Sequence, residues 1–172
     1  MILTEEWAER WREDGIVDRF PDGGLEVRWR SPVALGYAGP AVSEGKVYLL
    51  DYDRQTGEIS NNAGKRDRLT GLERVLCLSA ENGGLIWKKQ YQRPYNLSYP
   101  GGPRSTPTVA AGKVYALGAE GHLACLDAET GEEKWMIDLV REYGTTVPQW
   151  YAGQCPIVDG ARVILAPGGA DA

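Results

Sequence analysis

Few side chains in this sequence have types and spacings that could support chemistry. Histidine occurs once, at His122, and cysteine three times, at Cys77, Cys125 and Cys155. No two cysteines are adjacent and none forms a C-x-x-C pair, so the sequence argues against a zinc site and against a secreted disulfide scaffold. We predict that the cysteines are small core residues and that His122 lies in a surface turn.

Other catalytic constellations are equally hard to assemble from these residues. No nucleophile elbow accompanies His122, so no Ser-His-Asp set can be formed. Gly64-Lys65 lacks the upstream glycine spacing and the following Ser or Thr of a P-loop. The acidic residues form no cluster that could supply the roughly six to eight oxygens of a calcium site. We therefore predict no catalytic residue and no metal ligand.

Two connecting segments, residues 91–104 and 143–151, combine aromatic rings with polar and basic groups. Loops carry many binding sites, and Tyr, Trp and Arg contribute strongly to protein interfaces. We predict that both segments lie on one face and bind a protein partner or a polymer; the alternative is that many of these rings only pack the loops. The predicted binding residues are Arg104, Trp150, Tyr151, Tyr95 and Tyr99.

Internal repeats indicate which elements position these residues. One pattern of a proline, a β-branched residue, a turn and an apolar run occurs at residues 39–50, 106–117 and 155–165. A second pattern, an apolar strand followed by a turn and a closing tryptophan, occurs at residues 75–87 and 123–135. Each pattern is typical of a strand, a tight turn and a second strand. Together they predict an antiparallel unit of four strands.

The unit recurs with a period of about 48 residues, which is typical of propeller blades. Trp87 and Trp135 occupy one repeat position, and we expect them to pack between blades. Gly83 and Gly131 should supply the positive φ of the turn, and Asp127 should hydrogen-bond its own turn near Thr130. The fold class is therefore all-β. We expect a partial β-propeller with about two complete blades and half of a third, part of a ring of roughly seven or eight blades.

The predicted organisation has an N-terminal lead-in and a propeller part. The lead-in, residues 1–30, permits a short helix at residues 4–12 and ends with the closing strand of a preceding blade at residues 25–29. Residues 52–73 are polar without clear periodicity, so we expect them to form a mobile insertion loop. The expected blades cover residues 31–90, 103–138 and 152–172.

Composition excludes some classes of function. Nineteen basic and 24 acidic residues give a net charge of −5, so no global basic field favours nucleic acid. No apolar run approaches the roughly 18 residues that a membrane helix needs. The residues after Met1 lack the basic and apolar regions of a signal peptide.

The turn at residues 127–135, Asp-Ala-Glu-Thr-Gly-Glu-Glu-Lys-Trp, resembles the repeat of the pyrroloquinoline-quinone-like (PQQ-like) β-propeller family. The copy at residues 79–87 departs from this pattern, with Ser79 in place of Asp and Asn82 in place of Thr. The resemblance implies that the tryptophan packs between neighbouring blades. The segment at residues 101–107 and the Trp-rich opening resemble the envelope-associated bacterial members, the outer-membrane assembly propellers, more than the quinoprotein dehydrogenases.

This resemblance implies a non-catalytic scaffold that binds a protein partner or a polymer in the bacterial cell envelope, with no cofactor. It suggests the periplasm or envelope as the location, although no signal peptide follows Met1. One alternative is a fragment of a quinoprotein alcohol dehydrogenase that uses PQQ and calcium. Those enzymes carry an adjacent Cys-Cys pair, a calcium site and a catalytic Asp, and this sequence has no such Cys pair. A second alternative is a carbohydrate-binding propeller.

Overall fold

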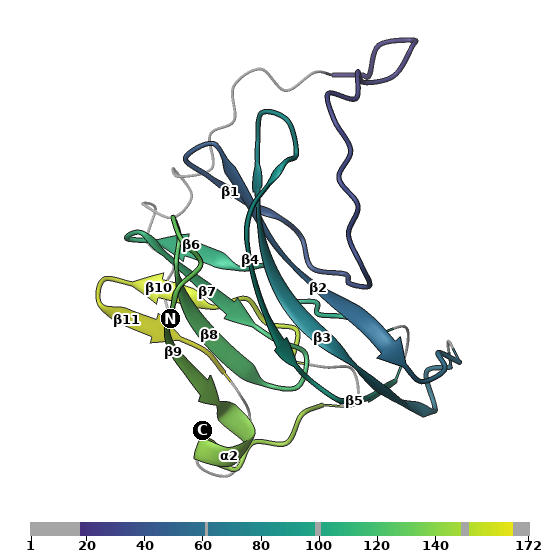
Figure 1. The fold of residues 1–172 in the computed structure, drawn as a ribbon, viewed down its shortest axis with the longest axis vertical. Coiled ribbons are helices and arrows are strands. Elements are labelled where there is room, and N and C mark those ends of the chain that lie inside the picture. Colours follow the sequence, from purple (N-terminus) through teal and green to yellow (C-terminus); the bar gives the residue numbers. More distant parts are fainter. Residues whose placement is uncertain (1–17, 61, 99–100, 149–151, 167–172) are drawn as a thin grey trace.

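The computed structural model describes residues 18–60, 62–98, 101–148 and 152–166, and they fold into successive antiparallel sheets (Figure 1). In the first sheet the strands lie side by side in chain order, and a fifth strand pairs with the far end of the third. Its strands are β1 (Ala41–Ser43), β2 (Lys46–Thr56), β3 (Arg66–Ser79), β4 (Leu85–Gln92) and β5 (Tyr95–Ser98).

The second sheet repeats the same up-and-down order, followed by a two-stranded beginning of a third. Its strands are β6 (Thr108–Ala110), β7 (Lys113–Leu117), β8 (His122–Asp127) and β9 (Glu133–Asp138); the third sheet has β10 (Ile157–Asp159) and β11 (Arg162–Ile164). The register shifts between Cys77 and Leu78 in the first sheet and between Cys125 and Leu126 in the second, at one repeat position. The all-β fold of four-stranded antiparallel blades is confirmed.

The expectation of a mobile loop at residues 52–73 is wrong for most of that segment. β2 continues to Thr56 and pairs along nearly its whole length with residues 70–79 of β3, whose first residues, 66–69, pair with β5. Only residues 57–65 therefore connect β2 to β3. Exposure alternates along β3, with Asp67 and Glu73 on the inward side. Because two inward positions carry acids, the two-residue hydrophobic period of a strand is hidden in the sequence.

The tip of this hairpin is fixed by its own hydrogen bonds. The Asp67 carboxylate accepts hydrogen bonds from the Ser60 backbone N–H at 2.7 Å and from the Ser60 hydroxyl at 2.8 Å. These bonds hold the pKa of Asp67 below its usual value. The β2–β3 hairpin is therefore an ordered extension of the first blade.

Three further elements differ from expectation or lie outside the described residues. β5 lies inside the predicted connection 91–104, and the short helix α2 (Leu139–Tyr143) follows β9, with Asp138 as its N-cap. Residues 25–29 were expected to form a closing strand, but no strand occurs between residues 18 and 30. The helix expected at residues 4–12 lies outside the described residues.

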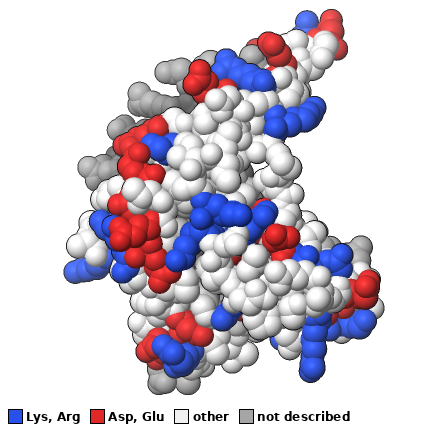
Figure 2. All heavy atoms as spheres, in the orientation of Figure 1, with Lys and Arg blue, Asp and Glu red and all other residues white. Residues whose placement is uncertain are grey.

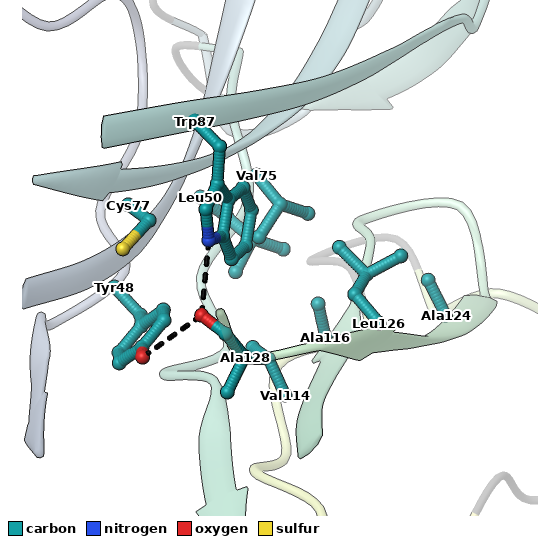
Figure 3. Close-up of a cluster of buried hydrophobic side chains, with 10 residues drawn as sticks. All are labelled: Tyr48, Leu50, Val75, Cys77, Trp87, Val114, Ala116, Ala124, Leu126 and Ala128. Atoms are coloured by element: carbon teal, nitrogen blue, oxygen red, sulfur yellow. Dashed lines mark hydrogen bonds between the residues drawn. The ribbon is translucent and has the colours of Figure 1, made fainter. Parts of the chain in front are cut away.

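The main core lies between the first and second sheets (Figure 3). The first sheet contributes large side chains and the second mostly small ones, so that the two surfaces interlock: Tyr48, Leu50, Val75, Cys77 and Trp87 face Val114, Ala116, Ala124, Leu126 and Ala128. Cys77 and Cys125 are fully buried, as predicted. Cys155 is exposed, so the expectation that it is a core residue is wrong.

A tryptophan joins each unit to the turn of the next. The Trp87 indole donates a hydrogen bond to the Ala128 carbonyl at 2.9 Å, and a Cβ on Gly131 would stand only 2.6 Å from the ring (Figure 3). Trp29 repeats this arrangement on the first blade, with a 2.9 Å hydrogen bond to Ala80 and its ring against Gly83. Trp29 therefore occupies the repeat position although residues 18–28 before it form no strand.

The turn that receives Trp87 is shaped as the repeat predicts. One Asp127 carboxylate oxygen accepts hydrogen bonds from the backbone N–H groups of Glu129 and Thr130, at 3.0 and 3.1 Å, and from the Thr130 hydroxyl at 3.1 Å. Gly131 has φ of 72°, a value that favours glycine. Trp135 lies at the matching position of the second blade, tilted against Tyr115 as Trp87 is against Tyr48.

Candidate functional site

A buried carboxylate is the centre of a polar network between the two blades. Glu73, on β3, is fully buried in the described structure. Its Oε1 accepts a hydrogen bond from the Tyr91 hydroxyl, and its Oε2 accepts one from the Tyr95 hydroxyl and a third from the Ala119 backbone N–H at 3.1 Å. The carboxylate thus joins strands β3, β4 and β5 of the first blade to the β7–β8 turn of the second.

The second blade leaves room for this carboxylate at Gly118. A Cβ at that position would overlap the Glu73 carboxyl group, so any other residue would displace it. In the repeat, Gly118 corresponds to Asp51 of the first blade. Glycine is required here because the neighbouring blade fills the space of a side chain.

Burial dominates the ionisation of Glu73. Removing the carboxylate from water raises its pKa above the usual value of 4.5. Hydrogen bonds from Tyr91, Tyr95 and Ala119, together with the charge of Arg93, lower the pKa but do not cancel the effect of burial. The same burial, and the nearby Glu73 charge, raise the pKa of both tyrosines well above 10.

A second part of the network surrounds His122, which begins β8 and is buried. The Arg93 guanidinium donates a hydrogen bond to His122 Nδ1, and His122 Nε2 lies 3.2 Å from the Asp138 carboxylate. Both contacts are satisfied by a neutral ring with its proton on Nε2. Burial and the Arg93 charge lower the pKa of His122, against the opposing effect of Asp138. His122 was expected in a surface turn, and that expectation is wrong.

This network can hold two blades together, and its geometry supports that role. The polar atoms of Glu73 and His122 are engaged by protein groups, so each would have to lose an internal contact to meet a ligand. Among the described residues, no group of three or more His, Cys, Asp or Glu side chains could hold a metal ion.

A buried ion pair on the opposite face of the first sheet fixes the segment before β1. Arg74 donates to both oxygens of Asp51, at 2.6 and 2.5 Å. The Ala34 backbone N–H also donates to Asp51, at 2.7 Å, and Leu35 bridges to Tyr52. These contacts position the backbone that carries Tyr37.

Tyr37 and Arg104 meet at the entrance to the two innermost strands. Each lies three residues before the repeat proline, so they occupy equivalent positions in successive blades. The Arg104 guanidinium lies 4.7 Å from the centre of the Tyr37 ring, and the Tyr37 N–H donates to the Pro103 carbonyl at 2.8 Å. Tyr37 is 56% exposed, so this cation–π pair presents a polar aromatic surface.

The third blade continues this row. Gly153 is the equivalent residue there, and a Cβ on it would stand 3.9 Å from the Cβ of Arg104. The Ser105 hydroxyl donates to the Gln154 carbonyl at 2.7 Å. The innermost strand β6 contacts both β1 and β10. Equivalent positions of successive blades therefore line one side of a common centre.

The other predicted binding residues divide into two groups. The ring of Tyr95 is buried and stacks on Tyr52 with 3.8 Å between ring centres, which favours a structural role, and its predicted contact with a partner stays a prediction. Tyr99, Trp150 and Tyr151 lie outside the described residues. Of the five, Arg104 is thus the residue that the structure places beside an exposed surface.

Sequence reasoning missed the Glu73 network and the role of His122. Glu73 lay in the segment expected to be a loop, and Arg93 lay in a connection noted for its aromatic rings. Their partners are up to 46 residues away and belong to the next blade. The signal that was present is the glycine at position 118, where the first blade has an aspartate.

A groove lies beside this network, between the hairpin extension and the second blade. Its volume is about 500 Å³. The lining residues come from β3, from the β4–β5 connection and β5, and from the β7–β8 turn: Arg68, Leu69, Thr70, Arg93, Pro94, Tyr95, Asn96 and Glu120.

Comparison with known proteins identifies the repeat. The family model described as outer membrane protein assembly factor BamB matches residues 72–171. No curated protein matches. Among the described residues, no helix has the length and apolar character needed to cross a membrane.

Two solved structures are similar to the chain in fold. BamB from Moraxella catarrhalis is 19% identical with a TM-score of 0.48, over 77% of this chain and 35% of that chain. The quinohemoprotein alcohol dehydrogenase ADHIIG from Pseudomonas putida HK5 is 24% identical with a TM-score of 0.40, over 83% of this chain and 21% of that chain. The chain therefore spans only a minor part of either protein's length.

Proposed function

We propose, from the premise that this chain belongs to the family of the outer membrane protein assembly factor BamB, that it is part of a non-catalytic scaffold in the bacterial cell envelope. Its blades would bind a protein partner at the face where the segments between successive blades enter the innermost strands. The propeller scaffold follows from the family; the partner, the envelope location and the absence of catalysis are the proposal.

The observation that carries the proposal is the Arg104–Tyr37 pair. An exposed tyrosine with an arginine over its ring combines two of the three side-chain types, Trp, Tyr and Arg, that are enriched at the hot spots of protein interfaces. Both backbones are held from beneath, through Asp51 on one side and through Ser105 on the other. A partner would therefore meet a surface that loses little conformational freedom on binding.

The buried polar residues support the same proposal. The carboxylate of Glu73 and the ring of His122 are used in contacts between blades. A catalytic acid or base must lie within hydrogen-bond reach of the substrate atom that gains or loses the proton. The pair of the exposed Tyr37 and the half-buried Arg104 is therefore a better candidate for function than the buried network.

Site-specific crosslinking in the full-length protein tests the proposal. We expect Tyr37→p-benzoylphenylalanine to yield a crosslinked protein partner in the native bacterium, and the same residue at position 162 to yield none. Arg104→Ala should abolish this crosslink, whereas Arg162→Ala should retain it, because Arg162 is an exposed residue at the start of β11, away from this pair. Identical crosslinks at both positions, or none at either, would contradict the proposal.

The absence of a cofactor is tested separately. Full-length protein mixed with PQQ and calcium should show no saturable quenching of tryptophan fluorescence and no reduction of an electron-accepting dye with alcohols. Saturable binding together with dye reduction would favour the quinoprotein dehydrogenase. Binding of soluble glycans that competes with the Tyr37 crosslink would favour a carbohydrate-binding propeller.

A further inference from the structure

We infer that the groove beside the β2–β3 hairpin binds an extended acidic peptide segment of a protein partner, with Arg68 as its anchoring cation. This inference rests on the proposed function, because it adds a second contact surface and a partner chemistry to the same scaffold. Three features of the groove support such a ligand: its charge, its shape and the hydrogen bonds already made along its edge strand β5.

The charge of the groove is locally positive although the chain is acidic. Arg68 and Arg93 line it, against the single acid Glu120. Two further basic residues, Lys65 and Arg66, are exposed on the same hairpin, and Figure 2 shows basic side chains, with acidic ones between them, at the lower right, where this hairpin lies in Figure 1. An acidic segment would be attracted to this part of the molecule.

The cations and the acid of the groove differ in their availability. Arg93 contacts His122 and lies 3.8 Å from Asp138, so its charge is partly used. Glu120 accepts a hydrogen bond from the Asn96 backbone N–H at 2.7 Å. The exposed Arg68 guanidinium has no hydrogen-bond or ion-pair partner among the described residues. An incoming carboxylate can therefore pair with Arg68 without breaking a hydrogen bond or an ion pair within the protein.

The edge of β5 explains why side chains must carry the recognition. The outward N–H of Asn96 is taken by Glu120, and its carbonyl accepts a hydrogen bond from Arg66 at 3.3 Å. A peptide could not add to this edge as another strand without breaking both contacts. The exposed side-chain amide of Asn96 therefore offers a polar contact beside Arg68, whereas the Thr70 hydroxyl is hydrogen-bonded to the Thr56 hydroxyl at 2.5 Å.

The apolar part of the groove favours a peptide over a lipid surface. Pro94 is exposed in this concave site of about 500 Å³, and the buried side chains of Leu69 and Tyr95 lie beneath its surface. A concave site with a cation above an apolar floor fits alternating acidic and aliphatic side chains of an extended chain. A flat array of anionic headgroups could not reach its floor.

Fluorescence anisotropy with full-length protein tests the inference. The probe is a labelled peptide that alternates glutamate with leucine and serine, and its control carries glutamine in place of glutamate. We expect the acidic peptide to bind and the control to bind at least about tenfold more weakly. Affinity for the acidic peptide should fall as salt rises, since exposed charges are screened.

Variants of the groove should separate specific binding from general attraction. Arg68→Glu should lower the affinity for the acidic peptide at least about tenfold. Asn96→Asp, which changes a single exposed polar group, should also lower this affinity. Arg162→Glu makes the same change of charge at an exposed position at the start of β11 and should leave the affinity unchanged. Circular dichroism melts of the variants show whether the fold is retained.

Three results would overturn the inference: no binding of the acidic peptide, equal binding by Arg68→Glu, or binding only to phosphatidylglycerol vesicles. Failure here can be told apart from failure of the proposed function. If the Tyr37 crosslink persists while the peptide does not bind, the scaffold proposal stands and the groove assignment falls. If Arg68→Glu removes peptide binding while no crosslink forms at Tyr37, the groove assignment stands alone.

Discussion

At the scale of single residues, the joint between the blades depends on a few atoms that are each used more than once. The Ala128 carbonyl accepts hydrogen bonds from the Trp87 indole, at 2.9 Å, and from the Tyr48 hydroxyl, at 3.2 Å. The Glu73 carboxylate accepts three. Such sharing concentrates the stability of the joint in side chains whose loss leaves several partners unsatisfied.

The raised pKa of Glu73 predicts a pH dependence of stability. A carboxyl group with a higher pKa in the folded than in the unfolded state contributes stability that is fully present below the unfolded pKa, near 4.5, and is lost as pH rises through the folded pKa. Glu73→Gln removes this titration. We therefore expect the unfolding free energy of Glu73→Gln, taken relative to that of the wild type at the same pH, to be higher at about pH 8 than at about pH 5.

Urea denaturation at the two pH values measures this difference. Glu81→Gln is the matched control, because Glu81 is an exposed acid in the β3–β4 turn and should show little change between the two pH values. A difference between wild type and Glu73→Gln that stays constant with pH would contradict a raised pKa.

At the scale of elements, the turns that receive tryptophans require glycine for two reasons: the positive φ of the backbone and the close contact with the indole ring. Gly131 combines a φ of 72° with the Trp87 ring, which would lie 2.6 Å from a Cβ. Gly112 has a similar φ of 69°, but nothing would lie within 4 Å of its Cβ. The two positions therefore separate backbone strain from the contact with the indole.

Replacing both glycines by alanine should give unequal losses. Gly112→Ala should cost about 1 kcal/mol of unfolding free energy, the strain of a left-handed residue. Gly131→Ala should cost at least about 2 kcal/mol, because Trp87 must also move from its hydrogen bond with Ala128. Urea denaturation measures both, and equal losses would show that the indole contact adds nothing.

The strands also show how far sequence reasoning reached. The repeat phrases predicted the four-stranded units, since their apolar runs and turn glycines depend on local pattern. The hairpin extension was missed because Asp67 and Glu73 occupy inward positions of β3. Asp67 is held there by Ser60, seven residues earlier in the chain. Glu73 is held by Tyr91, Tyr95 and Ala119, which lie 18, 22 and 46 residues away and so outside a local window.

The candidate site was predicted only in part for a similar reason. Arg104 was identified from its residue type and its place before an inner strand. Tyr37 was missed, although it holds the equivalent position one blade earlier. The contact of 4.7 Å between them depends on the angle between successive blades, which the repeat length does not determine.

At the scale of the whole molecule, the packing of large against small side chains sets the distance between the first two sheets. Ala116 and Ala124 are fully buried against the first blade. Close-packed interiors tolerate added volume poorly. The spacing of the sheets, and with it the relation between Tyr37 and Arg104, therefore depends on alanine at these positions.

Ala116→Leu should test this dependence. Overpacking of a close-packed interior costs about 1–3 kcal/mol, so we expect a loss of unfolding free energy of that size. Ala161→Leu, in the exposed β10–β11 turn, adds the same atoms without a buried neighbour and should change stability by less than about 0.5 kcal/mol. Urea denaturation compares the two, and an equal effect would show that the interface is loosely packed.

The tryptophan joints have a direction. Trp29 precedes the first blade and packs on its turn, and Trp87 of the first blade packs on the turn of the second. Each unit therefore carries a tryptophan at one side and a turn that receives a tryptophan at the other. A gene that copies one such unit in tandem obtains a neighbour that already fits on both sides. The architecture is thus suited to lengthening by whole modules, with no redesign of the joints.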